Sequence, residues 1–266
     1  MKKSKIGIDA GGSLIKLCYE QKGKLHFKKY DYTQVESAIE WLKFLAPHSQ
    51  VRLTGGKAGV IQQTFLPEAR IIPEFTATCE GAQFLNKQST LPIKGPFLLV
   101  NIGTGTSWFL INGDHYERVL GSGMGGGTFV GLGNVISNER DFFKLNQLSS
   151  LGNKNNVDLL VKDIYHPLEP PINGDLTASN FGKVADIKPE DGIAALSNLM
   201  AETLILLTMQ TAKLHKVNEI VYIGNTLIGN SLLKTTLESY TTALGFSAYF
   251  LENGEFSGAV GAFMAD

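Results

Sequence analysis

Two short segments place small polar residues directly after apolar runs. Residues 6–16 read IGIDAGGSLIK, and residues 99–107 read LVNIGTGTS. A tight turn after a strand exposes consecutive backbone N–H groups that suit phosphate oxygens, and glycine lets the backbone approach a ligand closely. The Ser and Thr hydroxyls add donors without bulk. Together the two segments predict a pair of loops that hold a polyphosphate from both sides.

Two further features strengthen this prediction. Asp9 ends the first apolar run, where its carboxylate could hold Mg²⁺ directly or through water. A third glycine-rich run, GSGMGGGTFVGLG at 121–133, precedes a helical pattern, and a helix N-terminus favours anions. One such loop often only turns the chain, but three of them favour nucleotide binding. The sequence lacks GxxxxGK[ST], and no GxGxxG follows the first strand, so neither a P-loop nor a dinucleotide fold is supported.

Three charged side chains are candidates for chemistry beside these loops. Glu74 follows the apolar run 69–72 and precedes a helical pattern, so it could serve as a base at a strand end; the alternative is a first-turn helix acid. Arg118 stands beside the third glycine-rich run and could bind a carboxylate through two parallel hydrogen bonds; the alternative is a surface ion pair with Glu117. Lys16 could contact phosphate or remain a solvated strand residue.

The elements that must position these residues alternate along the chain, which predicts an α/β fold. Short apolar or alternating runs predict strands at residues 6–8, 14–19, 25–30, 51–54, 69–72, 97–102, 107–111, 116–120, 219–223 and 248–251. Apolar residues at helical spacing predict helices at residues 35–45, 75–85, 133–151, 192–216, 231–244 and 256–264. Thr33 to Glu36 has the spacing of a capping box, and Asn112-Gly113 suits a type I′ hairpin turn.

The order strand, glycine loop, strand, turn, strand occurs twice. Asp9 of the first unit aligns with Asn101 of the second, and Gly11 aligns with Gly103. This repetition predicts an internal duplication of one supersecondary unit rather than a short-period repeat protein. We therefore expect two lobes, residues 1–95 and residues 96–266.

Composition excludes several classes of protein. The chain has 266 residues, 43% of them hydrophobic, which is enough for a sizeable core. The net charge of -1 gives no footprint for nucleic acid. Cys18 and Cys79 form no CxxC or Cys/His cluster, so a zinc site or disulfide framework is not expected. No signal-peptide pattern or apolar run of about 20 residues is evident, so we expect a cytoplasmic protein without a membrane span.

The motifs also resemble those of a known family. DAGGSLIK, LTGGKAG, PEF, NIGTGTS, ERVLGSGMGGGT, PINGDLTASNFG, YIGNTL and ENGEFSGAVGA occur in this order, from Ile6 to Ala262. Each motif alone is loose, but the ordered set resembles the type II pantothenate kinases of staphylococci, within the actin-like ATPase and sugar kinase superfamily. The resemblance implies a duplicated actin-like (ribonuclease H-like) fold with two lobes and a nucleotide cleft between them. It also implies a homodimer that uses ATP and Mg²⁺ to phosphorylate the primary hydroxyl of pantothenate, the first step of coenzyme A biosynthesis.

The resemblance assigns roles residue by residue. Glu74 would be the catalytic base, and Asp9 would hold Mg²⁺. Residues expected at the nucleotide are Asp9, Ala10, Gly11, Gly12, Ser13, Leu14, Ile15, Lys16, Thr104, Gly126, Gly127, Thr128, Phe129, Val130, Phe142 and Asn225. Residues expected at pantothenate are Arg118, Thr177 and Tyr240, with part of the substrate channel from the partner subunit. From the residues alone, Thr177 could instead cap a helix at Ala178, and Tyr240 could belong to an interface core.

The sequence departs from the family pattern at three positions. Ser13 stands where Thr is usual, which keeps the hydroxyl. Asn225 stands where staphylococcal relatives have Ser, and Thr76 stands where an acidic residue is common. Asn225 can still form a hydrogen bond, although this contact is less secure.

Other functions remain open on the sequence alone. Another small-molecule kinase of the superfamily, such as a sugar or N-acetylhexosamine kinase, would share the loops, but the ENDA motif and the cysteine-rich zinc motif of many such kinases are not seen. Activator ATPases for radical dehydratases need cluster-bridging cysteines, for which Cys18 and Cys79 offer no convincing pair. The third alternative is an actin-like assembly protein or ATPase switch. Such proteins use inserted subdomains, for which a chain of 266 residues has little room.

Overall fold

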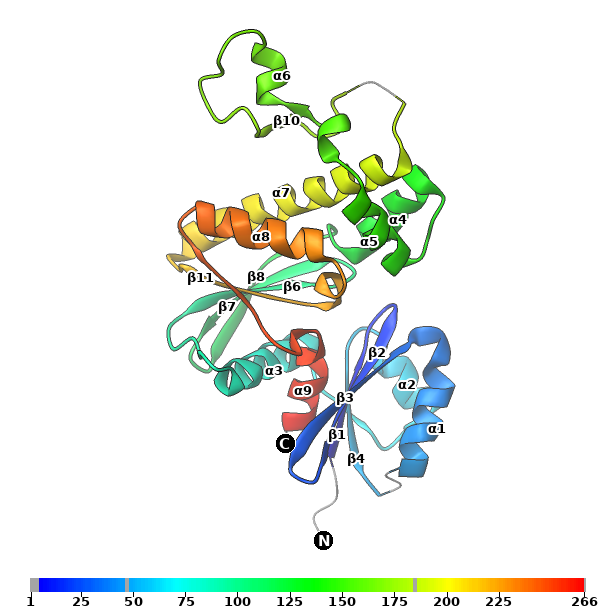
Figure 1. Ribbon diagram of the computed structural model, residues 1–266. Helices are drawn as coiled ribbons and strands as arrows, with labels where there is room; N and C mark the ends of the chain where they lie inside the picture. Colours follow the sequence, from blue (N-terminus) through cyan, green and yellow to red (C-terminus); the bar gives the residue numbers. More distant parts are fainter. Residues whose placement is uncertain (1–4, 46–47, 184–185, 266) are drawn as a thin grey trace.

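The structure is a computed structural model that describes residues 5–45, 48–183 and 186–265. It contains two lobes, each built around a five-stranded sheet (Figure 1). The ends of the predicted lobes at residues 1–4 and 266 lie outside the described residues. The first sheet has the order β3-β2-β1-β4-β5. Its strands are β1 (Lys5–Ala10), β2 (Leu14–Gln21), β3 (Lys24–Asp31), β4 (Gln50–Thr54) and β5 (Arg70–Ile71).

The second sheet repeats the arrangement of the first. Its order is β12-β11-β6-β7-β8, in which three antiparallel strands are again extended by two parallel ones. The strands are β6 (Phe97–Ile102), β7 (Thr106–Asn112), β8 (His115–Ser122), β11 (Glu219–Ile223) and β12 (Ser247–Phe250). Asp9 on β1 and Asn101 on β6 occupy corresponding places, so the predicted duplication is confirmed.

Helices cover both faces of the first sheet. Helices α1 (Val35–Leu45) and α2 (Ala58–Thr64) bury their apolar side chains against one face, where Ile39 and Ile61 join the strand residues Ile8 and Leu53. The C-terminal helix α9 (Ser257–Met264) covers the other face, packing on β1, β2 and β4. The core on this face is therefore formed by residues from the N-terminal strands and from the C-terminal helix.

Helix α3 (Glu74–Gln88) packs between α9 and the second sheet. Cys79 and Ala82 of α3 lie in one buried cluster with Leu99 and Val221 of the second sheet. The contact between α3 and α9 is close because both carry glycines at the crossing; a Cβ on Gly81 would overlap the Ser257 carbonyl. Helix α3 precedes residue 95 and α9 follows it, so their contact joins the two predicted lobes. The boundary between the lobes at residue 95 remains a prediction.

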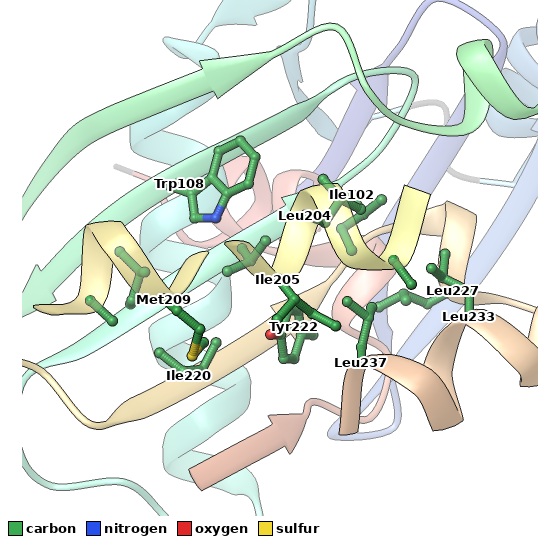
Figure 2. Close-up of a cluster of buried hydrophobic side chains, with 14 of the residues drawn as sticks. Ile102, Trp108, Leu204, Ile205, Met209, Ile220, Tyr222, Leu227, Leu233 and Leu237 are labelled. Atoms are coloured by element: carbon green, nitrogen blue, oxygen red, sulfur yellow. The ribbon is translucent and has the colours of Figure 1, made fainter. Parts of the chain in front are cut away.

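The other face of the second sheet carries the largest core (Figure 2). Helices α7 (Pro189–His215) and α8 (Ser231–Ala243) pack there. Two polar groups in this core are satisfied internally: Trp108 Nε1 donates to Thr208 Oγ1 at 2.8 Å, and the Tyr222 and Thr241 hydroxyls lie 2.8 Å apart. Among the described residues, α7 alone has the length and hydropathy of a membrane span, but 72% of that window is buried within the protein. It is therefore a core helix here.

Two further helices and an arm complete the second lobe. Helices α4 (Gly126–Ser137) and α5 (Phe142–Leu151) pack on α7. The arm, which we define as residues 157–183, extends beyond α7 at the top of Figure 1. It contains β9 (Leu159–Leu160), α6 (Val161–Tyr165) and β10 (Thr177–Ser179), and β9 and β10 pair as a small sheet.

Three local predictions were wrong. Asp31, not Thr33, begins the turn before α1: its Oδ1 accepts from the Thr33 backbone N–H at 2.9 Å, and a 3₁₀ turn precedes Val35. The hairpin between β7 and β8 turns at residues 113–114, since Asn112 pairs with His115 and a positive φ of 57° falls on the glycine. The helix predicted over 133–151 is two helices, because Asn138 adopts the left-handed conformation.

Candidate functional site

The first lobe presents a row of polar side chains across four adjacent strands. Lys29 on β3 pairs with Lys16 on β2, Lys16 pairs with Asp9 on β1, and Asp9 pairs with Thr54 on β4. Residues that pair directly across a sheet carry their side chains on the same face. The preceding row on this face includes Gly7 and Cys18, which α9 covers. The polar row therefore begins where the cover of α9 ends.

Asp9 and Lys16 form an ion pair at the centre of this row. Lys16 Nζ lies 3.6 Å from Asp9 Oδ2, and the two side chains are only 15% and 17% exposed. Burial raises the pKa of Asp9, and the Lys16 charge partly offsets this effect. The carboxylate is seated between two glycines: a Cβ would lie 2.7 Å from Oδ1 at Gly55 and 2.8 Å from Oδ2 at Gly258. Any larger residue would displace the carboxylate.

The charges of Asp9 and Lys16 both affect the pKa of Glu74. Glu74 is the first residue of α3, directly after Pro73. Burial raises the pKa of Glu74, the Asp9 charge raises it further, and Lys16 opposes the shift. A helix N-terminus alone would stabilise the ionised form and lower the pKa. Glu74 as a whole is exposed to solvent, and a raised pKa favours the uptake of a proton by its carboxylate.

Arg118 is directed toward the start of α3 by its strand. The register of β7 and β8 shifts between Trp108 and Phe109, and such bulges re-aim side chains. The Arg118 guanidinium lies 5.1 Å from the centre of the Phe75 ring, and its Nε donates to Ser107 Oγ at 3.3 Å. Gly121 makes room for it, because a Cβ there would overlap the guanidinium. Arg118 and Glu74 thus lie in one region.

The second glycine-rich loop (residues 101–107) and the third (residues 121–133) are joined by backbone hydrogen bonds. The backbone N–H groups of Gly126 and Gly127 donate to the carbonyls of Gly103 and Thr104 at 2.8 and 2.9 Å. Thr226 Oγ1 also donates to the Gly103 carbonyl, at 2.8 Å. The first two amides of α4 are therefore occupied by loop carbonyls in this structure. Thr104 itself remains exposed at the loop tip.

Several residues predicted to bind the nucleotide have buried side chains. Ala10, Ile15 and Phe129 are fully buried in the cores, so they could contribute only backbone groups. Phe142 packs edge-on against Phe129, with ring centres 5.8 Å apart. Gly12, Ser13 and Gly127 are exposed, whereas Gly11, Leu14, Gly126, Thr128 and Val130 are partly buried.

Asn225 joins the two lobes. It lies in a 3₁₀ turn, Asn225–Leu227, directly after β11. Its Oδ1 accepts a hydrogen bond of 3.0 Å from Lys29 Nζ on β3 of the first lobe. Lys29 was missed by the sequence reasoning, although counting outward from the predicted turn at Lys22-Gly23 pairs it with Lys16.

Thr177 and Tyr240 belong to a second, separate group. Thr177 lies on β10 and not at a helix cap, so that alternative is wrong. Its Oγ1 donates to Glu202 Oε1 at 2.7 Å, and Asn198 Nδ2 donates to the same oxygen at 3.0 Å. Burial raises the pKa of Tyr240, and the charge of Glu202 raises it further. Glu202 therefore bonds to Thr177 and also affects the pKa of Tyr240.

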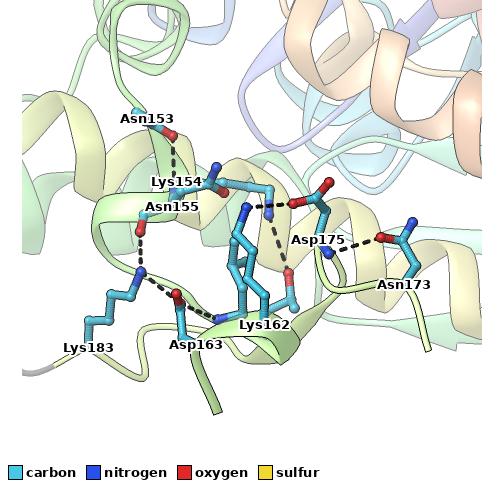
Figure 3. Close-up of polar contacts among 10 residues, drawn as sticks. Asn153, Lys154, Asn155, Lys162, Asp163, Asn173, Asp175 and Lys183 are labelled. Carbon is cyan, nitrogen blue, oxygen red and sulfur yellow. Dashed lines mark hydrogen bonds and ion pairs between the residues drawn. The ribbon is translucent and has the colours of Figure 1, made fainter. Parts of the chain in front are cut away.

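This second group borders a cavity of about 460 Å³. Lys154, Asn198, Ser239 and Tyr240 are among the polar residues of its wall. The arm that carries Thr177 is held by ion pairs between Lys162 and Asp175 and between Lys183 and Asp163, at 2.7 and 2.9 Å (Figure 3). In Figure 1 the arm lies at the top, beyond α7, whereas α3 packs on the face of the second sheet that is opposite α7. One chain therefore does not unite Thr177 with Glu74.

Two lobes with equivalent sheets, and polar loops at corresponding strand ends, define the actin-like fold. Solved structures agree with this fold. An activator of 2-hydroxyisocaproyl-CoA dehydratase from Clostridium difficile with bound ADPNP matches with a TM-score of 0.64 at 15% identity, over 98% of this chain and 92% of that one. A ROK family glucokinase from Streptomyces griseus in complex with glucose and AMPPNP matches with a TM-score of 0.55 at 11% identity, over 98% of both chains.

Sequence comparison narrows the class to a family. The Fumble family model matches residues 20–265. A type II pantothenate kinase of Oceanobacillus iheyensis is 40% identical, over 98% of this chain and 99% of the relative. One from Staphylococcus aureus strain USA300 is 39% identical, over 97% of this chain and 98% of the relative. The chain belongs to the Fumble family, which comprises the type II pantothenate kinases.

Proposed function

We propose that this chain transfers the γ-phosphoryl group of ATP to the primary hydroxyl of pantothenate. The product would be 4′-phosphopantothenate, in the first step of coenzyme A biosynthesis. The observation that carries the proposal is the buried Asp9–Lys16 ion pair, whose charges both act on the pKa of Glu74, in a chain of the pantothenate kinase family. This arrangement supports Glu74 as a proton acceptor that acts near the groups proposed to hold the phosphates.

Phosphoryl transfer depends mainly on positioning and charge neutralisation. Lys16 would neutralise phosphate charge, while the exposed loop residues Gly12 and Ser13 would supply hydrogen-bond donors. Glu74 would accept the proton of the attacking hydroxyl, a role worth roughly 10²–10⁴-fold in rate. Its raised pKa suits this role, because the carboxylate gains from taking up a proton.

Asp9 would hold Mg²⁺. Its carboxylate is only 17% exposed and its pKa is raised by burial, so a divalent cation would stabilise its ionised form. The described residues contain no group of three or more His, Cys, Asp and Glu side chains that could hold a metal by themselves. Mg²⁺ commonly binds through one or two carboxylates together with substrate phosphates, so a single Asp fits. When bound, the ion would neutralise charge on the phosphate oxygens.

Arg118 would bind the pantothenate carboxylate. Its guanidinium is held over the Phe75 ring, one residue from Glu74. Among the described residues it forms no ion pair with Glu117, so the alternative of a surface pair finds no support. A guanidinium held in this way is prepared for a carboxylate that arrives with the substrate.

We further infer that the enzyme is a homodimer in which the partner supplies Thr177 and Tyr240. Within one chain Thr177 bonds to Glu202 of α7 and Tyr240 lies on α8, whereas Glu74 begins α3 on the opposite face of the second sheet. The test mixes two inactive variants, Glu74→Gln and a Thr177→Ala/Tyr240→Phe double variant. A shared site predicts that mixed dimers recover activity, since one of their two sites is intact. Active enzyme in a monomeric peak on size exclusion would contradict the dimer.

The proposed setting is the cytoplasm, with two small molecules as substrates. The apolar helix α7 packs in the core of the second lobe, which supports this setting. The near balance of 24 basic and 25 acidic residues gives no reason to add nucleic acid as a partner.

The deciding assay follows ADP release by the purified protein with Mg·ATP, with and without pantothenate. We expect turnover that requires pantothenate, and phosphopantothenate identified by mass. If the protein binds ATP but pantothenate adds no turnover, the nucleotide site stands and the substrate assignment fails. Sugars and N-acetylhexosamines would then be screened, and sedimentation with ATP would test for assembly.

A further inference from the structure

We propose that Lys29 is a second phosphate-binding lysine, which leaves Asn225 and binds the polyphosphate of ATP together with Lys16. The inference rests on the proposed function, because it assigns the nucleotide to the junction between the two lobes. It adds a binding residue that lies outside the glycine-rich loops.

The sheet register places Lys29 beside the phosphate loop. Lys29 on β3 stands directly opposite Lys16 on β2, on the face that also carries Asp9. Like charges that face each other across two strands destabilise a sheet. Lys16 has Asp9 at 3.6 Å to balance it. The hydrogen-bond partner of Lys29 at 3.0 Å is the neutral amide oxygen of Asn225, and among the described residues Lys29 forms no ion pair, so its charge has no direct counter-ion.

The surroundings of Lys29 support the same assignment. Burial lowers the pKa of Lys29, Glu255 opposes this shift, and Lys16 adds to it. Glu255 lies in the 3₁₀ turn before α9, so Lys29 is the point at which β3, that turn and Asn225 approach one another. An anion placed between Lys29 and Lys16 would relieve the repulsion between them. Lys29 bonds to Asn225 and pairs with Lys16 next to the first loop, so a phosphate chain bound between Asn225 and that loop would lie near both lysines.

The neighbouring residue provides a matched control. Lys28 is also a lysine on β3, but strand alternation directs it to the opposite face. There its Nζ lies 3.7 Å from the centre of the Trp41 ring. Removing Lys28 changes the net charge by the same amount without touching the proposed site.

The test measures dissociation constants of adenosine, AMP, ADP and ATP by calorimetry for the wild type and for four variants: Lys29→Ala, Lys29→Arg, Lys28→Ala and Asn225→Ala. We expect Lys29→Ala to weaken ATP and ADP about ten-fold and adenosine less than two-fold, because the lost contact is charge-assisted. Lys29→Arg should restore most of the affinity, and Lys28→Ala should match the wild type. Asn225→Ala breaks the same hydrogen bond but keeps the charge, so its effect should not increase with the number of phosphates.

Two results would overturn the inference while leaving the proposed function intact. One is a wild type that binds ATP with a Lys29→Ala variant of equal affinity. The other is a Lys29→Ala variant that loses adenosine and ATP binding equally, which would make Lys29 only a tie between the lobes. A wild type that fails to bind ATP would instead refute the proposed function itself, and the inference with it.

Discussion

Lys16 Nζ lies 3.6 Å from Asp9 Oδ2, and the two residues stand directly opposite each other on β2 and β1. Both side chains are mostly buried, and the carboxylate is enclosed by Gly55 and Gly258, from a loop of the first lobe and from the C-terminal helix. The pair is thus fixed by three separate parts of the chain. The charges of both members also affect the pKa of Glu74 at the start of α3, after the larger effect of burial.

The first prediction concerns Glu74 as the base. Glu74→Gln should lower kcat by roughly 10²–10⁴-fold, because the hydroxyl loses its proton acceptor. The dissociation constant for ATP should change little, since the amide has nearly the same shape and reduces negative charge near the phosphates. Steady-state kinetics and calorimetry measure the two quantities.

The control for this prediction is Glu80→Gln. Glu80 is an exposed acid of the same helix. The Glu80→Gln variant should therefore keep the turnover of the wild type. A Glu74→Gln enzyme with kcat within a few-fold of the wild type would remove Glu74 from the chemistry.

The second prediction is a pH dependence with a defined sign. The pKa of Glu74 is raised first by burial and then by Asp9, so the free enzyme takes up this proton at a higher pH than an ordinary Glu does. The protonated form is inactive as a base. The acidic limb of kcat/KM for pantothenate should therefore lie above the ordinary Glu pKa of about 4.3. A pH–rate profile that stays flat down to that value would contradict this.

The same shift predicts an effect on stability. A carboxyl group whose pKa is raised in the folded state binds more protons folded than unfolded, so its contribution is lost as pH rises through the folded-state pKa. Glu74→Gln should therefore raise the thermal midpoint at pH 8. The difference should vanish below the unfolded pKa, where both states carry the proton. The effect should be small, because Glu74 is exposed to solvent, which screens its charge. Calorimetric scans at pH 8 and pH 4 check the sign.

The duplicated sheets could be predicted from sequence because their signals are local. Each strand is indicated by a short apolar run, such as residues 97–102, and by the glycine turn that follows it. Both signals lie within a few residues of each other in the sequence. The pairing of Lys29 with Lys16 was equally accessible, since it follows from a two-residue turn. Glycine turns also indicated where the backbone comes close to other groups, as at Gly55.

The rest of the site depends on contacts between distant segments. Strand β10 has three residues and no alternating pattern, and it exists because it pairs with β9. The hydrogen bond between Thr177 and Glu202 joins the arm to α7, which are separate elements of the chain. The amides of Gly126 and Gly127 look free in the sequence, but they are taken by carbonyls of another loop. Such pairings between separate elements have no local pattern that would reveal them.

The third prediction concerns the core of the second lobe. Trp108 Nε1 donates to Thr208 Oγ1 inside a fully buried cluster. Thr208→Val keeps the shape of the side chain but leaves the indole N–H without a partner. It should lower the free energy of unfolding by about 1–3 kcal/mol, measured by urea titration. The matched control is Thr203→Val, because Thr203 Oγ1 donates only to the backbone carbonyl of Leu199. Equal losses in both variants would assign the effect to the helix and not to Trp108.

The fourth prediction separates the position of Arg118 from its charge. Gly121→Ala adds a single methyl group where the guanidinium lies, so Arg118 must move away from Phe75. The KM for pantothenate should rise several-fold, while the ATP affinity stays close to that of the wild type. Arg118→Ala should give a larger rise, and Arg118→Lys should restore little, because an ammonium cannot form two parallel hydrogen bonds with a carboxylate.

The chain offers a close control for that methyl group. Gly123, two residues further along, has open space around the position of a Cβ and no positive φ, so Gly123→Ala should leave KM unchanged. If Gly121→Ala and Gly123→Ala raise KM equally, the glycine-rich loop itself is responsible. If neither changes KM while Arg118→Ala does, the guanidinium reaches the substrate from another position. Only a rise confined to Gly121→Ala ties pantothenate binding to the place that the guanidinium occupies above Phe75.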